Sequence, residues 1–215
     1  MAKTSADAHL DLSVDTTVAL RAAWEGCVFA DVPHIATLSD GGHFSRVVLR
    51  GYDLAAQGLG GVLGIQPPIE INRAITTGTR TVMKLGPDEW LILAEAEAEI
   101  QLDRLPAANL AAVDVSHRQA ALRIAGPSVE AVLSAGCPLP LDMAAFPVNR
   151  ATRTLFAKSE IILWRTAAGT FHVEVARSFV PYLIAHLNRA IEVEAALQSH
   201  QSTGQRTPGA LGRAL

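Results

Sequence analysis

The sequence predicts an α+β protein built from a pair of split β-α-β units, with helices packed on antiparallel sheets. Segments in which apolar residues alternate are followed by segments with helical spacing, so that each half of the chain runs roughly β-α-β-β-α. A weak repeat supports this order: TRTV at 79–82 recurs as TRTL at 152–155, and Val-Leu at 62–63 recurs at 132–133. The offsets, 73 and 70 residues, are close enough to suggest a duplication with small insertions.

The first half contains the signals for three strands and two short helices. The predicted elements are a strand at 45–50, a helix at 53–59, strands at 79–85 and 90–94, and a helix around 96–105. Gly86-Pro87-Asp88-Glu89 joins the last two strands as a hairpin, because proline and aspartate favour turn conformations. The run GLGGVLG at 58–64 has leucine where a G-x-G-x-x-G motif needs its last glycine. We interpret it as a helix C-terminus and a connection, not as a dinucleotide-binding loop.

The second half opens on the stretch VDVSHRQAALRIAGPSVEAVL at 113–133, which reads as strand, turn, strand and helix. Gly126-Pro127 starts that helix, since proline loses nothing at the first helical position, and Gly136 ends it. The predicted elements are a strand at 120–124, a helix at 127–135, strands at 159–165 and 170–176, and a final helix from Ser178 to about residue 197.

The predicted organisation is one domain over residues 17–198, composed of two pseudo-repeats at about 40–110 and 111–198. Residues 1–16 are polar and predict a flexible N-terminal segment. Residues 199–215 are rich in Ser, Gln, Gly and Thr and predict a mobile C-terminal tail.

Composition excludes several classes of protein. The chain has 215 residues, is 49% hydrophobic and carries a formal net charge of −3, which does not favour nucleic acid or an anionic membrane as partner. Cys27 and Cys137 form no C-x-x-C pair and suit a reducing compartment. We find neither a signal peptide nor an apolar run long enough for a membrane span, and we expect a cytoplasmic protein.

Asp114, Ser116 and His117 lie within four residues and resemble the parts of a catalytic triad. Successive side chains of an extended segment point to opposite faces, so Asp114 and Ser116 would face away from His117. We interpret the segment as a turn in which Asp and Ser bond to backbone N–H groups. The other polar candidates also predict no functional site. Asp88-Glu89 is interpreted as a solvated hairpin tip, and the seven histidines show no metal-ligand spacing. We therefore expect no catalytic, cofactor-binding or metal-binding residues in this chain.

Three segments together resemble the γ subunit of heterotetrameric sarcosine oxidase. The first is LGPDEWLIL at 85–93. The second is the stretch at 113–133, which continues through GCPL at 136–139, Leu-Asp at 141–142 and Phe-Pro at 146–147. The third consists of separated matches between Arg153 and Tyr182, including LWR at 163–165 and FHVEV at 171–175. The resemblance covers about residues 79–187. The stretch at 113–133 is also similar to the folate-binding fold of aminomethyltransferases, which contains duplicated ferredoxin-like units and agrees with the two predicted halves.

The resemblance implies an accessory, non-catalytic γ subunit of a complex that oxidises sarcosine to glycine and passes the one-carbon unit to tetrahydrofolate. The partners would be the α, β and δ subunits, and FAD, FMN, NAD and tetrahydrofolate would be held by subunits other than this one. A partner surface is plausible on the final helix and its start, at Arg177, Phe179, Tyr182, His186 and Arg189, since aromatic residues and arginine are enriched in interfaces. Packing of this face on the chain's own sheet is the equal alternative.

Two other functions stay open. A free-standing folate-binding or one-carbon-transfer protein would need a carboxylate facing the pteridine, for which Asp114 and Glu174 are the first candidates. A γ-type subunit of a related N-methyl amine oxidase complex would have nearly the same sequence pattern.

Overall fold

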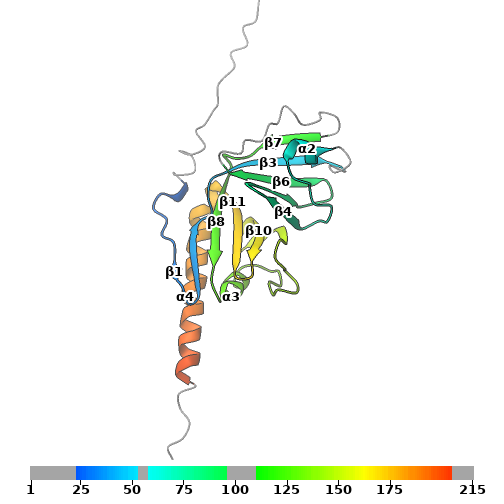
Figure 1. Cartoon of the computed structure of the whole chain (residues 1–215). Coiled ribbons are helices and arrows are strands. Elements are labelled where there is room, and N and C mark those ends of the chain that lie inside the picture. The colour runs from blue at the N-terminus through cyan, green and yellow to red at the C-terminus, as the bar shows by residue number, and fades with distance from the viewer. Residues whose placement is uncertain (1–22, 53–57, 96–109, 205–215) are drawn as a thin grey trace, which may run out of the picture.

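The computed structural model describes residues 23–52, 58–95 and 110–204 (Figure 1). It contains helices and two antiparallel sheets, which confirms the α+β class. The predicted flexible segment at 1–16, most of the predicted helix at 53–59, the predicted helix around 96–105 and the end of the predicted tail lie outside the described residues.

Sheet A has six strands in the described part, in the order β1-β2-β8-β11-β10-β9, and each neighbouring pair is antiparallel. Its strands are β1 (Asp31–Val32), β2 (Ala36–Asp40), β8 (Gln119–Ala125), β9 (Ala151–Phe156), β10 (Ser159–Ala167) and β11 (Thr170–Ala176). The N-terminal strand β2 therefore joins a sheet whose other long strands all come from the second half of the chain.

Sheet B has five strands in the described part, in the order β4-β5-β6-β3-β7, again with antiparallel neighbours. Its strands are β3 (Phe44–Gly51), β4 (Arg73–Thr77), β5 (Arg80–Lys84), β6 (Glu89–Glu95) and β7 (Leu110–Asp114). The predicted hairpin at 79–94 is confirmed as β5 and β6.

The two sheets are stacked, and helices cover their outer faces (Figure 1). The helices are α2 (Leu59–Leu63), α3 (Val129–Ser134), the 3₁₀ turn η2 (Arg177–Phe179) and α4 (Val180–Gly204). One core lies between sheet A and the helices α3 and α4, and a second lies between sheet B and α2. A third core joins Met83 and Leu91 of sheet B to Ala151 and Ile162 of sheet A. The buried apolar side chains of this third core hold the sheets together.

The two sheets share one strand order. Each half runs strand, helix and three strands, and these strands are ordered β4-β5-β6-β3 in sheet B and β9-β10-β11-β8 in sheet A. A fifth strand, β7 or β2, is antiparallel to the first strand of its set. The repeated Val-Leu pair lies on α2 and α3, which hold equivalent positions. The TRT segments, in contrast, lie around β5 and on β9, which are not equivalent.

The predicted split β-α-β units are not seen around α2 or α3. The strands before and after α2 are β3 and β4, and two other strands lie between them in sheet B. The strands before and after α3, β8 and β9, are separated by two strands of sheet A in the same way. Each of these pairs is therefore antiparallel, whereas a split β-α-β unit needs a parallel pair. The strands β6 and β7 do run parallel on either side of β3, as a split unit requires. The residues that connect them, 96–109, lie outside the described part.

Three helices differ from their predicted bounds. α3 begins at Val129, so Pro127 lies in the turn before the helix and not at its first position. The glycine run at 58–64 contains α2 itself, because buried Leu59 and Leu63 anchor one turn between Gly58 and Gly64, both in the left-handed conformation. The final helix starts at Val180 and continues through Gly204, so that residues 199–204 are helical and not part of a tail. The side chains of Ser199, His200 and Ser202 bond to carbonyls three or four residues earlier in the same helix.

Candidate functional site

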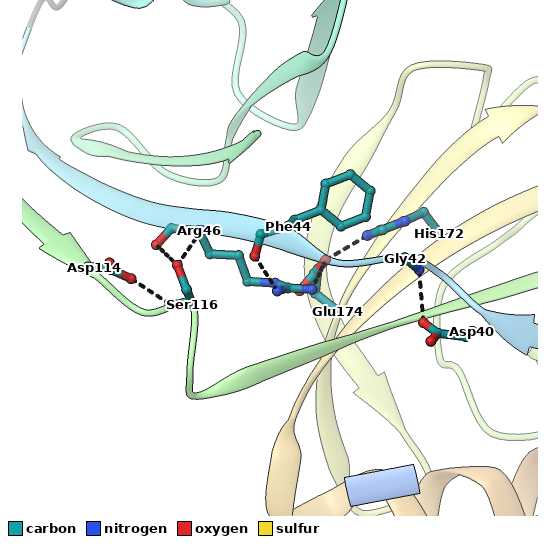
Figure 2. Close-up of polar contacts among 8 residues, drawn as sticks. All are labelled: Asp40, Gly42, Phe44, Arg46, Asp114, Ser116, His172 and Glu174. Atoms are coloured by element: carbon teal, nitrogen blue, oxygen red, sulfur yellow. Dashed lines mark hydrogen bonds and ion pairs between the residues drawn. The ribbon is translucent and has the colours of Figure 1, made fainter. Parts of the chain in front are cut away.

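A buried ion pair joins the two sheets (Figure 2). Arg46 comes from β3 of sheet B and Glu174 from β11 of sheet A, and both side chains are completely buried. Arg46 Nε donates to Glu174 Oε2 at 2.6 Å, and Arg46 Nη2 donates to Oε1 at 3.2 Å. The third arm of the guanidinium, Nη1, donates to the Phe44 carbonyl at 2.9 Å. The guanidinium is thus held by both sheets in a bidentate geometry.

His172 completes this cluster from the same face of β11. Its Nε2 lies 2.7 Å from Glu174 Oε1, and its ring contacts the rings of Phe44 and Trp164 at centroid distances of 5.6 and 5.5 Å. Both carboxylate oxygens of Glu174 are therefore occupied by side chains of the protein itself. We refer to Arg46, His172 and Glu174 as the inter-sheet cluster.

Opposing effects act on the Glu174 carboxyl. Burial alone raises its pKa, because a low-dielectric environment disfavours the charged form. The positive charge of Arg46, with the hydrogen bond and charge of His172, outweighs burial and holds the pKa of Glu174 below its usual range. The carboxylate is consequently ionised at neutral pH and serves as an anchor for Arg46.

Strand alternation places these polar groups between the sheets. On β3, Arg46 and Val48 point toward sheet A, while Val47 and Leu49 pack in the core with α2. On β11, His172 and Glu174 point toward sheet B, while the intervening apolar residues face α3 and α4. A buried charge with no partner would be costly, so the stacking of the sheets depends on matching these two faces.

The segment with Asp114, Ser116 and His117 is a turn, as its sequence predicts. The Ser116 N–H donates to Asp114 Oδ1 at 2.8 Å, while the Arg46 N–H donates to Ser116 Oγ at 2.8 Å (Figure 2). His117 is exposed. Ser116 thus extends the pairing of β7 along β3 and binds the backbone of Arg46, beside the inter-sheet cluster. The spacing of residues in the sequence does not reveal this contact.

An open cleft of about 570 Å³ lies beside the cluster and reaches the surface. Its walls come from β3, from β8 to β11 and from η2, and Glu174 forms part of its lining. Arg118 and Lys158 also line it, and in the described part of the chain their side chains have no hydrogen bond or ion pair. The Gln119 Oε1 atom is buried at the cleft and has no partner among the described groups.

Arg153, another cationic residue of the cleft, is fully engaged. It pairs with Glu89 of sheet B and, at 2.8 Å, with Glu160 of its own hairpin. The Asp88-Glu89 turn is thus more than a solvated hairpin tip, because Glu89 links the two sheets. Arg153 is 38% exposed, and solvent weakens such pairs.

We expect Arg153→Gln to change the free energy of unfolding by less than about 1 kcal/mol. Urea titration of the purified chain measures this change. A loss of several kcal/mol would show that the inter-sheet contact depends on Arg153, contrary to the exposure of its ion pairs.

The five residues predicted as a partner surface are all exposed or half-buried, whereas the apolar side chains of the same helix face inward. Leu183 and Leu187 are buried against sheet A, so the apolar stripe of α4 packs within the chain. On the outer face, Phe179 meets Tyr182 edge to face, and the Tyr182 ring stacks on His186 at 4.0 Å.

The two arginines of the predicted surface have separate surroundings. The half-buried Arg177 donates its backbone N–H to the Arg118 carbonyl at 2.9 Å. The exposed Arg189 forms a surface ion pair with Glu192 at 3.1 Å.

Sequence reasoning missed two buried arginines, Arg46 and Arg165. Arg165 donates to Glu130 at 2.8 Å and to the Leu141 carbonyl, and its guanidinium lies over the Phe171 ring at 4.4 Å. Each arginine occupies a strand position whose alternation points it inward, and this is the signal that could have identified them. Their partners, in contrast, come from other elements and could not be identified locally.

Two further properties concern the described part of the chain only. No group of three or more His, Cys, Asp or Glu side chains that could hold a metal ion occurs there. Among the helices described, none is long and apolar enough to cross a membrane.

Residues 53–193 match the sequence profile of the "Sarcosine oxidase, gamma subunit family". The sarcosine oxidase subunit gamma of Corynebacterium sp. (strain P-1) is 29% identical over 137 residues, which cover 62% of this chain and 66% of that protein. The subunit gamma of Corynebacterium sp. (strain U-96) is 32% identical over 121 residues, covering 54% of this chain and 58% of that protein. The alignments thus span about two thirds or less of the length of these relatives.

Two solved structures have a similar fold. A chain of the heterotetrameric sarcosine oxidase from Corynebacterium sp. U-96, solved with pyrrole 2-carboxylate, superposes with a TM-score of 0.69 at 25% identity, covering 81% of this chain and 90% of that one. The glycine cleavage system aminomethyltransferase T from Bartonella henselae superposes with a TM-score of 0.57 at 12% identity, covering 79% of this chain and 56% of that one. The second similarity shows a shared fold alone.

Proposed function

The chain belongs to the sarcosine oxidase gamma subunit family, and we propose that it is the accessory, non-catalytic γ subunit of a cytoplasmic heterotetrameric sarcosine oxidase. The observation that carries this proposal is the superposition on a chain of such a heterotetramer over 90% of that chain's length. The complex would demethylate sarcosine to glycine and deliver the one-carbon unit to tetrahydrofolate. Its partners would be the α, β and δ subunits, and the α and β subunits would hold FAD, FMN, NAD and tetrahydrofolate.

The contacts of the inter-sheet cluster support a non-catalytic role. A general acid or base must be able to reach a proton of the substrate. Glu174 accepts hydrogen bonds from Arg46 and His172, and the His172 ring is buried and contacts two aromatic rings. These groups stabilise the packing of the sheets and leave no oxygen of Glu174 for a reaction.

We also propose that the two sheets descend from a duplicated unit, with pseudo-repeats at about 40–110 and 111–198 inside one domain of residues 17–198. The common strand order of the two sheets supports this proposal. The equivalent positions of α2 and α3 support it as well.

The isolated chain should be colourless and should not oxidise sarcosine. Absorption spectra of the purified chain test for bound flavin, and an oxygen-consumption assay with sarcosine tests for turnover. The complete complex, measured at the same molar concentration, is the positive control. Turnover by the chain alone would overturn the proposal.

A free-standing folate-binding protein would require a carboxylate that is free to bind a pteridine. Asp114 is exposed and does not line the cleft, and both oxygens of Glu174 already accept hydrogen bonds from Arg46 and His172. We therefore expect no heat when tetrahydrofolate is titrated into the isolated chain in a calorimeter. Saturable heat of binding would favour the folate-binding function instead.

A further inference from the structure

The mouth of the cleft continues onto the outer face of α4. Arg118, Leu155, Lys158 and Phe179 line the cleft. The Lys158 N–H donates to the Tyr182 hydroxyl at 3.3 Å, and Tyr182 contacts both Phe179 and His186 through its ring. These six residues form one continuous surface across the β7–β8 turn, the β9–β10 hairpin, η2 and α4, which we call the cleft-mouth surface.

Two large apolar side chains are exposed on this surface. Leu155 is 48% exposed and Phe179 is 46% exposed, and both line the cleft. Exposed apolar side chains at a concave site, surrounded by polar residues, are typical of positions where a partner inserts an anchoring side chain. The inner face of α4 packs on sheet A, so the chain itself does not use this surface as a core.

The charge of the surface specifies the chemistry of the partner. Arg118 and Lys158 have no ionic partner in the described part of the chain, whereas the neighbouring Arg153 has two. The chain as a whole is slightly negative, with a formal net charge of −3, so this pair of free cations is a local feature. Complementary charge across an interface requires a carboxylate from the partner.

We propose that the cleft-mouth surface binds an acidic segment of another subunit of the complex. An apolar side chain of that segment lies in the cleft between Leu155 and Phe179, and its carboxylate contacts Arg118 and Lys158. This inference rests on the proposed function, because it requires the chain to be a subunit of a larger complex.

Zero-length carbodiimide coupling of the purified complex tests the contact directly, since it joins a lysine amine to a carboxylate in contact with it. Mass spectrometry should find Lys158 joined to an Asp or Glu of another subunit. Acetylation of Lys158 should also be about tenfold slower in the complex than in the free chain, because binding at this surface buries the amine. Coupling of Lys158 to a second copy of this chain, or unchanged acetylation, would overturn the proposal.

A charge-reversal variant gives an independent test. Arg118→Glu/Lys158→Glu should weaken association with the other subunits about 10- to 100-fold, because like charges would then face each other. Arg73→Glu is the matched control, since Arg73 is exposed on the edge strand β4 and does not line the cleft. Both variants should keep a Tm within about 2 °C of the wild type.

The outcomes separate this inference from the proposed function. If the double variant associates as tightly as the wild type, the docking site is wrong while the subunit assignment stands. If the wild-type chain itself associates with no flavin-bearing subunit, the proposed function fails and the inference fails with it.

Discussion

Glu174→Gln should lower the free energy of unfolding by about 3–5 kcal/mol, because it leaves a buried guanidinium without its counter-ion. Arg46 is fully buried, and two of its three guanidinium nitrogens donate to this carboxylate. A glutamine at 174 has nearly the same shape but no charge, so the loss reports electrostatics and not packing. Urea titration followed by circular dichroism measures the change.

Glu160→Gln is the matched control for this substitution. Glu160 also pairs with an arginine of the cleft, but its side chain is 63% exposed. The same chemical change should therefore cost less than about 1 kcal/mol. Equal losses at positions 160 and 174 would contradict the role of the inter-sheet cluster.

The contribution of Glu174 should also depend on pH. Its pKa in the folded chain lies below the value of about 4.3 expected for an unfolded glutamate. Its stabilising effect is therefore complete above that pH and is lost as the pH falls through the folded-state pKa, where the carboxylate takes up a proton. The difference in stability between wild type and Glu174→Gln should shrink below about pH 4. A difference that stays constant from pH 7 to pH 3 would contradict an ionised Glu174.

Gly126→Ala should destabilise the chain by about 2–4 kcal/mol, through steric overlap and backbone strain together. Gly126 connects β8 to the start of α3 and has a φ of +156°. A Cβ atom placed there would lie 2.4 Å from the Ile35 carbonyl oxygen and 2.6 Å from the Ala36 Cα. Both neighbours are backbone atoms at the start of β2 and cannot move without disturbing sheet A.

Gly61→Ala is the control, and we do not expect it to destabilise the chain. Gly61 lies inside α2, and a Cβ atom there would meet nothing within 4 Å. Alanine is the better helix former, so this variant should be unchanged or up to about 1 kcal/mol more stable. Thermal and urea unfolding of both variants decide the matter. A neutral Gly126→Ala would show that β2 does not pack against this turn as described.

Alternation in the sequence predicted the strands that have one or both faces in a core. The strand predicted at 170–176 coincides with β11, and the strand at 45–50 lies within β3. The strands β1, β2, β4 and β9 were missed. β4 lies at the edge of sheet B and is mostly exposed, so apolar periodicity is weak there. β2 pairs with β8, which lies far along the chain, and local sequence patterns do not encode such a long-range pairing.

The candidate site was predictable only in part, because local sequence patterns do not encode contacts between distant segments. The shared face of His172 and Glu174 follows from strand alternation, and the inward direction of Arg46 could have been inferred in the same way. Their contact could not be, because Arg46 and Glu174 are 128 residues apart and meet only when the sheets stack. The TRT repeat misled for a related reason: similar local residues lie around β5 and on β9, which occupy different positions in their sheets.

The central claim is that this chain is an accessory subunit of a flavin-bearing complex, and recovery of the chain from its native host tests this most directly. The chain carries an affinity tag and is purified under mild conditions, and the eluate is examined by absorption spectroscopy and by subunit analysis. We expect larger subunits in a fixed ratio to the chain, together with the absorption of bound flavin. Recovery of the chain without other subunits and without flavin absorption, under conditions that preserve other complexes, would contradict the claim.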